Sequence, residues 1–187
     1  MGTSAVKTAA KRSELVDQVA DQLLERGLQG LSLRPLAAAL GTSDRMLLHY
    51  FPDKEALVGA ALDRVSERLL QATRAAAPEP RPFAAVAAEL GGLFRGPRIK
   101  PYFRVWLDLA SIAASGETAY AAQAAAIGKA FRDWLSSSIL HPSPRRREAL
   151  AALAMAALDG CALFDALGLE GVADEAMEGL GILAGEE

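Results

Sequence analysis

Residues 31–57 read LSLRPLAAALGTSDRMLLHYFPDKEAL, and this stretch decides the fold. Its apolar spacing predicts two short helices joined by a tight turn and followed at once by a third helix. Ser32 is placed to cap the first helix through the amide of Arg34, because Pro35 has no N–H. Gly41 ends that helix, since glycine tolerates the left-handed conformation of a helix end. Such a helix-turn-helix pair is the shape that places one helix in a DNA major groove.

The second helix of this pair is polar where a DNA groove would meet it. Ser43 is expected to cap the helix, while Leu47, Leu48 and Phe51 face inward. Arg45 offers a forked donor that suits guanine or a phosphate. The residues expected to contact DNA are Ser32, Arg34, Thr42, Ser43, Arg45, Met46, His49, Tyr50 and Lys54. Spacing alone leaves a solvated helical hairpin as an equal alternative.

The order of these residues resembles the TetR family of one-component transcriptional regulators. The elements that carry the resemblance cover roughly residues 10–60 and read Gly27, Ser32, Leu36-Ala37, Gly41, Ser43, Tyr50-Phe51 and Lys54-Glu55-Ala56-Leu57. The resemblance implies that the second helix of the pair reads DNA. It also implies that the last two helices form a four-helix dimer interface, and that the rest of the chain holds a small-molecule effector.

One part of the second helix departs from the family pattern. The family often has Gly-Thr-Leu-Tyr where this chain has Arg45-Met46-Leu47-Leu48. Leu48 therefore replaces a position that is commonly aromatic. Because Arg45 and Met46 fall at positions that read bases in the family, we expect an unusual operator sequence.

Composition favours an all-α chain without an enzyme site. Of the 187 residues, 51% are hydrophobic, mostly Ala and Leu, and only 6% are aromatic. The sequence contains no run of 18 apolar residues, so we expect no membrane span. The single cysteine, Cys161, suits a reducing cytoplasm, and we interpret it as a packed core thiol. Because no phosphate loop or cluster with metal-ligand spacing stands out, we expect no catalytic residue, metal or cofactor.

The net charge of −3 does not by itself indicate nucleic-acid binding. Its distribution is more informative, because the only charged side chains within residues 1–12 are Lys7, Lys11 and Arg12. These cations form an arm suited to the DNA backbone or minor groove. The alternative is an ordinary solvated and disordered terminus.

Periodicity predicts about nine helices in two domains. We assign residues 1–55 to the DNA-binding domain and residues 56–187 to an effector-binding and dimerisation domain. The helices outside the helix-turn-helix pair are expected at about residues 13–26, 54–76, 83–94, 100–115, 117–139, 144–166 and 172–184. Asp53 should cap the helix that links the domains, a Pro-rich break is expected at residues 78–82, and Gly91-Gly92 should interrupt one helix.

The second domain is expected to hold two binding surfaces. The helix at residues 145–166 is apolar nearly all round and needs two partners. We expect a second subunit to cover Leu153, Ala157 and Gly160, with the central helix of a monomer as the alternative. The residues expected to line an effector pocket are Tyr102, Phe103, Trp106, Tyr120, Phe131, Trp134 and Asp159. Aromatic residues are more often core than pocket, and Asp159 could equally cap a neighbouring helix or bond across a dimer.

These patterns together predict a ligand-responsive repressor. We expect a homodimer that binds a palindromic operator in double-stranded DNA and is released by a small-molecule effector. The alternatives are an activator or effector-independent regulator of the same fold, or a helical enzyme or adaptor. The sequence identifies neither the effector nor the operator.

Overall fold

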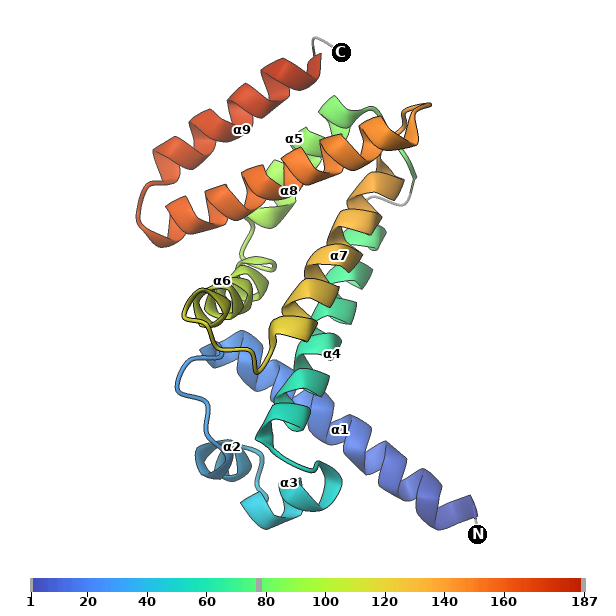
Figure 1. The fold of residues 1–187 in the computed structure, drawn as a ribbon, viewed down its shortest axis with the longest axis vertical. Helices are drawn as coiled ribbons and strands as arrows, with labels where there is room; N and C mark the ends of the chain where they lie inside the picture. Colours follow the sequence, from blue (N-terminus) through green and yellow to red (C-terminus); the bar gives the residue numbers. More distant parts are fainter. Residues whose placement is uncertain (1, 77–78, 186–187) are drawn as a thin grey trace. The chain divides into compact units, whose positions relative to one another are not determined.

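The computed structural model describes residues 2–76 and 79–185, and its secondary structure there is helical (Figure 1). The helices are α1 (Gly2–Arg26), α2 (Leu33–Ala39), α3 (Asp44–Tyr50), α4 (Lys54–Ala76), α5 (Phe83–Phe94), α6 (Lys100–Ala114), α7 (Ala121–Ser138), α8 (Pro144–Ala166) and α9 (Glu170–Gly185). Strand-like pairing in the described residues is limited to one parallel bridge between Arg81 and Ile139. The all-α prediction is confirmed.

The chain forms two compact units that each draw on separate stretches of sequence. The first unit takes residues up to 68 together with 104–125, and the second takes 69–103 with 126–187. Helices α4, α6 and α7 contribute residues to both units. The two domains expected from the sequence, residues 1–55 and 56–187, were defined by function and not by packing. That division stays a prediction. Pro78, at the start of the predicted Pro-rich break, lies outside the described residues.

Helix α1 provides the central apolar stripe of the first unit. Its buried side chains recur at helical spacing, and they are Leu15, Val16, Val19, Ala20 and Leu23. Buried side chains of the following helices complete this core, among them Leu36, Leu47, Phe51, Leu57 and Leu62. Helix α1 begins at Gly2 rather than near residue 13, because its Ala- and Lys-containing first half has high helix propensity. In the described residues this terminus is helical rather than disordered, and residues 6–14 are solvated as the alternative supposed.

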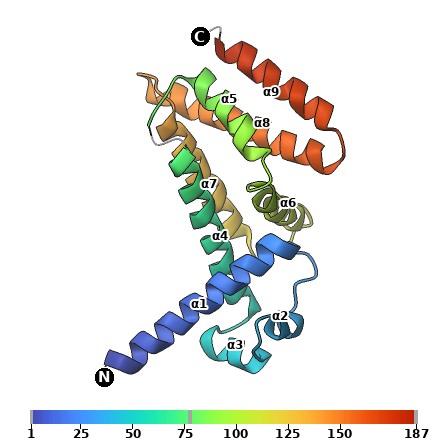
Figure 2. The ribbon, with the colours of Figure 1, turned by 180° about the vertical axis from the view of Figure 1, so that it is seen from behind.

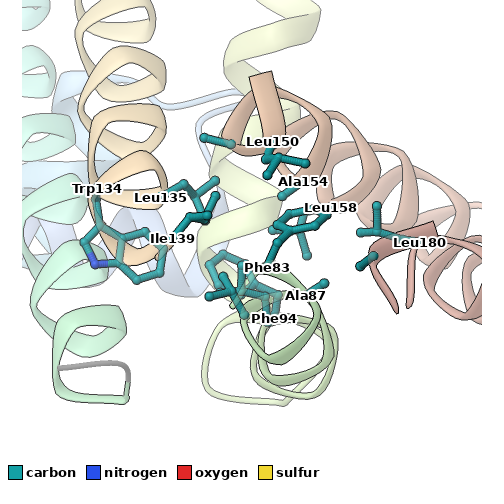
Figure 3. Packing of buried hydrophobic residues seen from close by; sticks show 14 of the residues in the cluster. Phe83, Ala87, Phe94, Trp134, Leu135, Ile139, Leu150, Ala154, Leu158 and Leu180 are labelled. Atoms are coloured by element: carbon teal, nitrogen blue, oxygen red, sulfur yellow. The ribbon is translucent and has the colours of Figure 1, made fainter. Parts of the chain in front are cut away.

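The second unit is organised around a cluster of buried apolar side chains from α5, α7, α8 and α9 (Figure 3). Phe83, Leu135 and Leu158 are members from three different helices. The predicted interruption at Gly91-Gly92 is wrong, because α5 continues through both glycines. Two glycines cost a helix about 1 kcal/mol each relative to alanine, and burial of the apolar face of α5 offsets this.

Helix α8 contains a long apolar stretch. It is the only described helix long and apolar enough to cross a membrane by length and composition, a test that core helices of soluble proteins also pass. One side of α8 is buried against α5 and α9, through residues such as Leu150, Ala154 and Leu158. Ser143 caps its first turn by accepting from the Arg146 N–H at 3.4 Å, as expected for a helix opened by Ser-Pro.

Candidate DNA-binding site

The turn between α2 and α3 has the geometry that the sequence predicts. Gly41 has a φ of +63°, a left-handed conformation that favours glycine. The Thr42 N–H donates to the Ala37 carbonyl at 2.9 Å and closes the end of α2. Ser43 Oγ accepts from the Met46 N–H at 3.2 Å, which confirms the predicted cap of α3.

The cap predicted for α2 is wrong. Ser32 occupies the N-cap position with an extended backbone, but its side chain makes no capping hydrogen bond. Pro35 stands at the third helical position, where the amide that usually receives a cap is absent. Only the Ser32 carbonyl takes part, accepting from the Leu36 N–H at 3.1 Å. The hydroxyl of Ser32 and the side chain of Arg34 lie on exposed residues.

Helix α3 presents one exposed face of mixed character. Arg45 and His49 are exposed, and Met46 is 44% exposed. Leu47 is fully buried, so α3 is anchored in the core on its other side. The prediction that Leu48 faces inward is wrong, because this side chain is 46% exposed. Leu48 follows Leu47 by one residue, which turns it about 100° around the helix and places it with the exposed side chains.

The last turn of α3 carries two aromatic side chains that contact each other. Tyr50 is half-buried, and its ring meets that of His49 edge-on with 5.0 Å between centroids. Phe51 follows as the C-cap residue and is buried. Thr42, at the other end of the helix, is also half-buried, so its contact surface is smaller than that of Arg45.

Helix α4 begins beside the start of α2. Asp53 Oδ1 accepts from the Ala56 N–H at 2.7 Å, which confirms the predicted cap. Lys54 Nζ donates to the Leu31 carbonyl at 3.0 Å. The sequence did not indicate this contact, because the two residues are 23 positions apart. This hydrogen bond holds the Lys54 ammonium group next to the residues that precede α2.

Two side chains of α6 form hydrogen bonds with the backbone at the end of α1. The sequence did not indicate these contacts. Asp108 Oδ2 accepts from the Leu28 N–H at 2.7 Å. Arg104, one turn earlier, donates to the Leu24 carbonyl. Gly27 has a φ of +81°, and a Cβ at this position would lie 2.6 Å from Asp108 Oδ2. The turn that leads from α1 to α2 is therefore fixed by α6 and requires glycine.

A group of ion pairs fixes α1 against α4. Arg64 and Arg68 both donate to Asp17, and Arg68 also reaches Asp21 at 2.7 Å. Hydrogen bonds from Arg64, and then from Arg68, hold the pKa of the Asp17 carboxyl below its usual value. The salt bridges orient the helix that precedes the helix-turn-helix pair.

The residues proposed for an effector pocket divide between the two units. Phe131 and Trp134 are buried in the second unit, and Tyr102 and Phe103 pack against the same cluster. Trp106 is half-buried and Tyr120 is buried, and both belong to the first unit. Asp159 is half-buried on α8. Burial and the nearby carboxylates of Glu55, Asp53 and Glu117 raise the pKa of Tyr120, which places its ring near the start of α4.

Phe94 links the aromatic residues of the second unit, and the sequence analysis missed it. Its ring centroid lies 5.4 Å from that of Phe103 and 5.4 Å from that of Phe131. Phe131 in turn lies 5.4 Å from Trp134. Figure 3 shows Phe94 and Trp134 within the buried cluster. The signal that could have found Phe94 is its position at the end of the apolar stripe of α5.

The side chains predicted to form a dimer surface are partly or largely exposed on α8, and α9 also carries exposed apolar side chains. Leu153 is 45% exposed, and Ala157 and Gly160 are partly exposed. Further large exposed apolar side chains on these helices and their connection are Leu163, Leu167, Leu169, Val172, Ile182 and Leu183. Arg95 fixes the connection by donating to Asp165 at 3.2 and 3.1 Å and also pairing with Asp174.

Cys161 has the surroundings of a core thiol. It is buried, and its Sγ donates to the Ala173 carbonyl at 3.5 Å. Burial raises the pKa of the Cys161 thiol, which favours its protonated form. Among the described residues, no group of three His, Cys, Asp or Glu side chains has the arrangement of a metal site.

Comparison with known proteins finds a family model that matches the segment containing α2 and α3. Residues 15–61 match the model of the bacterial regulatory proteins of the tetR family. The pair formed by α2 and α3 in this segment has the architecture of a helix-turn-helix motif. Over this segment the chain is similar to regulators of the TetR family. Members of this family are DNA-binding transcription factors rather than enzymes.

Two relatives that are similar to part of this chain are both named BetI. The HTH-type transcriptional regulator BetI of Burkholderia mallei (strain NCTC 10229) is 32% identical over 100 residues, which cover 52% of this chain and 51% of that protein. BetI of Paraburkholderia phytofirmans is 33% identical over 105 residues, which cover 52% and 54%. The chain thus spans about half the length of the curated relatives it matches.

Solved structures match nearly the whole chain. A transcriptional regulator from Rhodococcus sp. Rha1 has 26% identity and a TM-score of 0.72, with 94% of each chain covered. A TetR-family regulator from Cytophaga hutchinsonii has a TM-score of 0.78 over 96% of each chain. Its sequence identity is only 19%, so this similarity is evidence for the fold alone.

Proposed function

We propose that this protein is a ligand-responsive transcriptional repressor that binds a palindromic operator as a homodimer. The observation that carries the proposal is the exposed face of α3, held by the Ser43 cap and the buried Leu47 within the segment that matches the family model. That face offers Arg45, Met46 and His49 to a major groove. We place the protein in the cytoplasm, where its operator would be.

Arg45 is the residue that we assign to base recognition. It lies in the first turn of α3, and recognition helices contact base edges with their N-terminal residues. Its guanidinium can donate two hydrogen bonds to guanine O6 and N7. Ser32, Arg34 and Lys54 are assigned to the phosphate backbone, where they would set the register of the head on the duplex.

The dimer proposal is supported by the exposed apolar face of α8 and α9. Leu153 and Leu163 lie on one side of α8, while Ala157 and Gly160 are small enough to allow a second helix to approach closely. A two-fold pairing through this face would deliver two copies of α3 to half-sites of a palindrome. The alternative of a central helix in a monomer is less favoured, because these leucines are exposed.

The effector proposal is supported by the aromatic group around Phe94 in the second unit. An effector that prefers one arrangement of this unit would shift the spacing of the two heads through α4. Coupling of ~1–3 kcal/mol between the sites would change operator affinity roughly 5- to 150-fold. Asp159 would anchor a cationic or hydroxylated group, or it would bond across the dimer.

The proposal is tested by selecting DNA from a random-sequence library with the full chain and then measuring Arg45→Ala on the selected duplex. Loss of a bidentate base contact should weaken specific binding by ~1–3 kcal/mol and relax the preference at one base pair. Binding to random DNA should change little. Equal weakening on both duplexes would reduce Arg45 to a phosphate contact, and a wild-type chain that selects no sequence would refute DNA recognition.

The second candidate is an activator or effector-independent regulator of the same fold. It would share the α3 contacts and the dimer but would not release DNA with a ligand. A reporter gene placed downstream of the selected site separates the candidates. Expression that rises when the regulator is deleted favours the repressor, and expression that falls favours the activator.

A further inference from the structure

The first half of α1 carries an exposed basic segment, which we define as Lys7, Lys11 and Arg12. Residues 6–14 are all exposed, and the buried stripe of the helix begins only at Leu15. No acidic residue lies within residues 1–12. Figures 1 and 2 show this end of α1 extending past α3 in both views. The cations therefore lie on one continuous helix, in the part that precedes its buried stripe.

One cation ties the basic segment to the end of α3. The Arg12 Cζ lies 4.7 Å from the centroid of the Phe51 ring, and Phe51 is the C-cap residue of α3. Arg12 precedes Val16 by four residues, so it lies on the side of α1 that is buried further along the helix. Arg12 faces Phe51 from this side of α1. A guanidinium stacked on a ring still directs its N–H donors outward in its own plane.

The other two cations lie one turn apart on the neighbouring side of α1. Lys11 Nζ pairs with Glu14 at 3.0 Å, but the two side chains are 46% and 52% exposed. An ion pair as exposed as this one contributes little, so a phosphate competes with it readily. Lys7 precedes Lys11 by four residues and extends the positive charge along the helix.

We propose that the basic segment binds backbone phosphates in the DNA that flanks the base pairs read by α3. The inference rests on the proposed DNA-binding function. Three exposed cations beside the single carboxylate of Glu14 match a polyanion, and the Arg12–Phe51 contact sets Arg12 next to the end of α3. Phosphate contacts position a protein without reading sequence, so the basic segment raises affinity for every sequence and lengthens the footprint.

The test is the salt dependence of binding to a duplex that carries the selected site with long flanks. The slope of log affinity against log salt is negative. Lys7→Gln, Lys11→Gln and Arg12→Gln should each reduce its magnitude by roughly one, because each variant neutralises one phosphate fewer. Arg26→Gln is the matched control, because it removes the same charge from the far end of α1. It should leave the slope unchanged. Circular dichroism establishes that each variant is folded.

A second duplex, trimmed to the base pairs that α3 reads, removes the flanking phosphates. On this duplex the three variants should have the same slope as the wild-type chain. Unchanged slopes on the long duplex would overturn the inference, and so would a reduced slope that persists on the trimmed duplex. If Arg45→Ala loses specificity while these variants behave as wild type, only this inference fails. If the wild-type chain selects no sequence, the proposed function fails with it.

Discussion

Replacement of Gly27 by alanine tests how α6 holds the turn between α1 and α2. The φ of +81° costs a residue with a Cβ about 1–2 kcal/mol. The new Cβ would also lie 2.6 Å from Asp108 Oδ2, so the carboxylate must move away from the Leu28 N–H that it accepts at 2.7 Å. Loss of this charged hydrogen bond costs about 1.5–3 kcal/mol.

The two substitutions should not be additive. Asp108→Ala alone removes the same hydrogen bond and should cost about 1.5–3 kcal/mol. Added to Gly27→Ala, which has already broken the bond, Asp108→Ala should cost almost nothing. The coupling free energy of the double-mutant cycle should therefore be about 1.5–3 kcal/mol. The lower unfolded-state entropy of alanine appears in both backgrounds and cancels.

The assay combines urea unfolding at pH 7 with hydrogen exchange at the Leu28 amide. Exchange of this amide should quicken in both single variants and quicken no further in the double variant. Additivity within about 0.5 kcal/mol would refute the reasoning, since it would mean that the two residues act independently. Asn at position 108 keeps an acceptor oxygen and should restore part of the protection. That variant separates loss of the hydrogen bond from loss of packing.

Three further predictions concern the phosphate contact, the dimer and acid stability. Lys54→Ala should weaken binding to all DNA sequences and lower the salt slope by roughly one, whereas an unchanged slope would leave only its bond to Leu31. Ala157→Glu should give a monomer, or a misfolded chain, that has lost operator binding, because it buries a charge in a close interface; sedimentation of a folded dimer that still binds DNA would refute this. Because the pKa of Asp17 is lowered in the folded chain, its carboxylate stabilises the fold above the unfolded pKa of about 3.9, and this contribution is lost as pH falls through the folded value. Asp17→Asn should therefore be less stable than wild type at pH 7 in urea unfolding and nearly equal to it at pH 2.

Local signals in the sequence predicted much of the head. Ser43 and Asp53 form the expected caps because each bond joins residues only three positions apart. The buried stripe of α1 follows from apolar spacing alone. Leu48 was placed wrongly because the short apolar run 46–48 on a seven-residue helix leaves its inward direction ambiguous. The extent of α1 was underestimated because its first half has no core-facing stripe to mark it.

Contacts between distant residues could not be read from the chain. Asp108 reaches Leu28 across 80 positions, and Lys54 reaches the Leu31 carbonyl across 23. Carboxylates and ammonium groups of this kind are ordinary surface residues until packing supplies a backbone partner. Gly27 did mark the place, since a glycine after a helix indicates a left-handed turn. The glycine could not indicate that α6 would contact this turn.

The exposed apolar side chains of α8 and α9 favour association of the chain with a second copy in water. Fully burying a leucine contributes about 1.5–3 kcal/mol, so half-exposed residues such as Leu153 and Leu163 would each gain roughly half of this. Association costs an estimated ~4–15 kcal/mol in lost motion and ordering. A few leucines only balance that cost, and two-fold pairing doubles their number by using the same face twice. The small residues Ala157 and Gly160 would then add close backbone packing, which makes the pairing depend on shape as well as on apolar area.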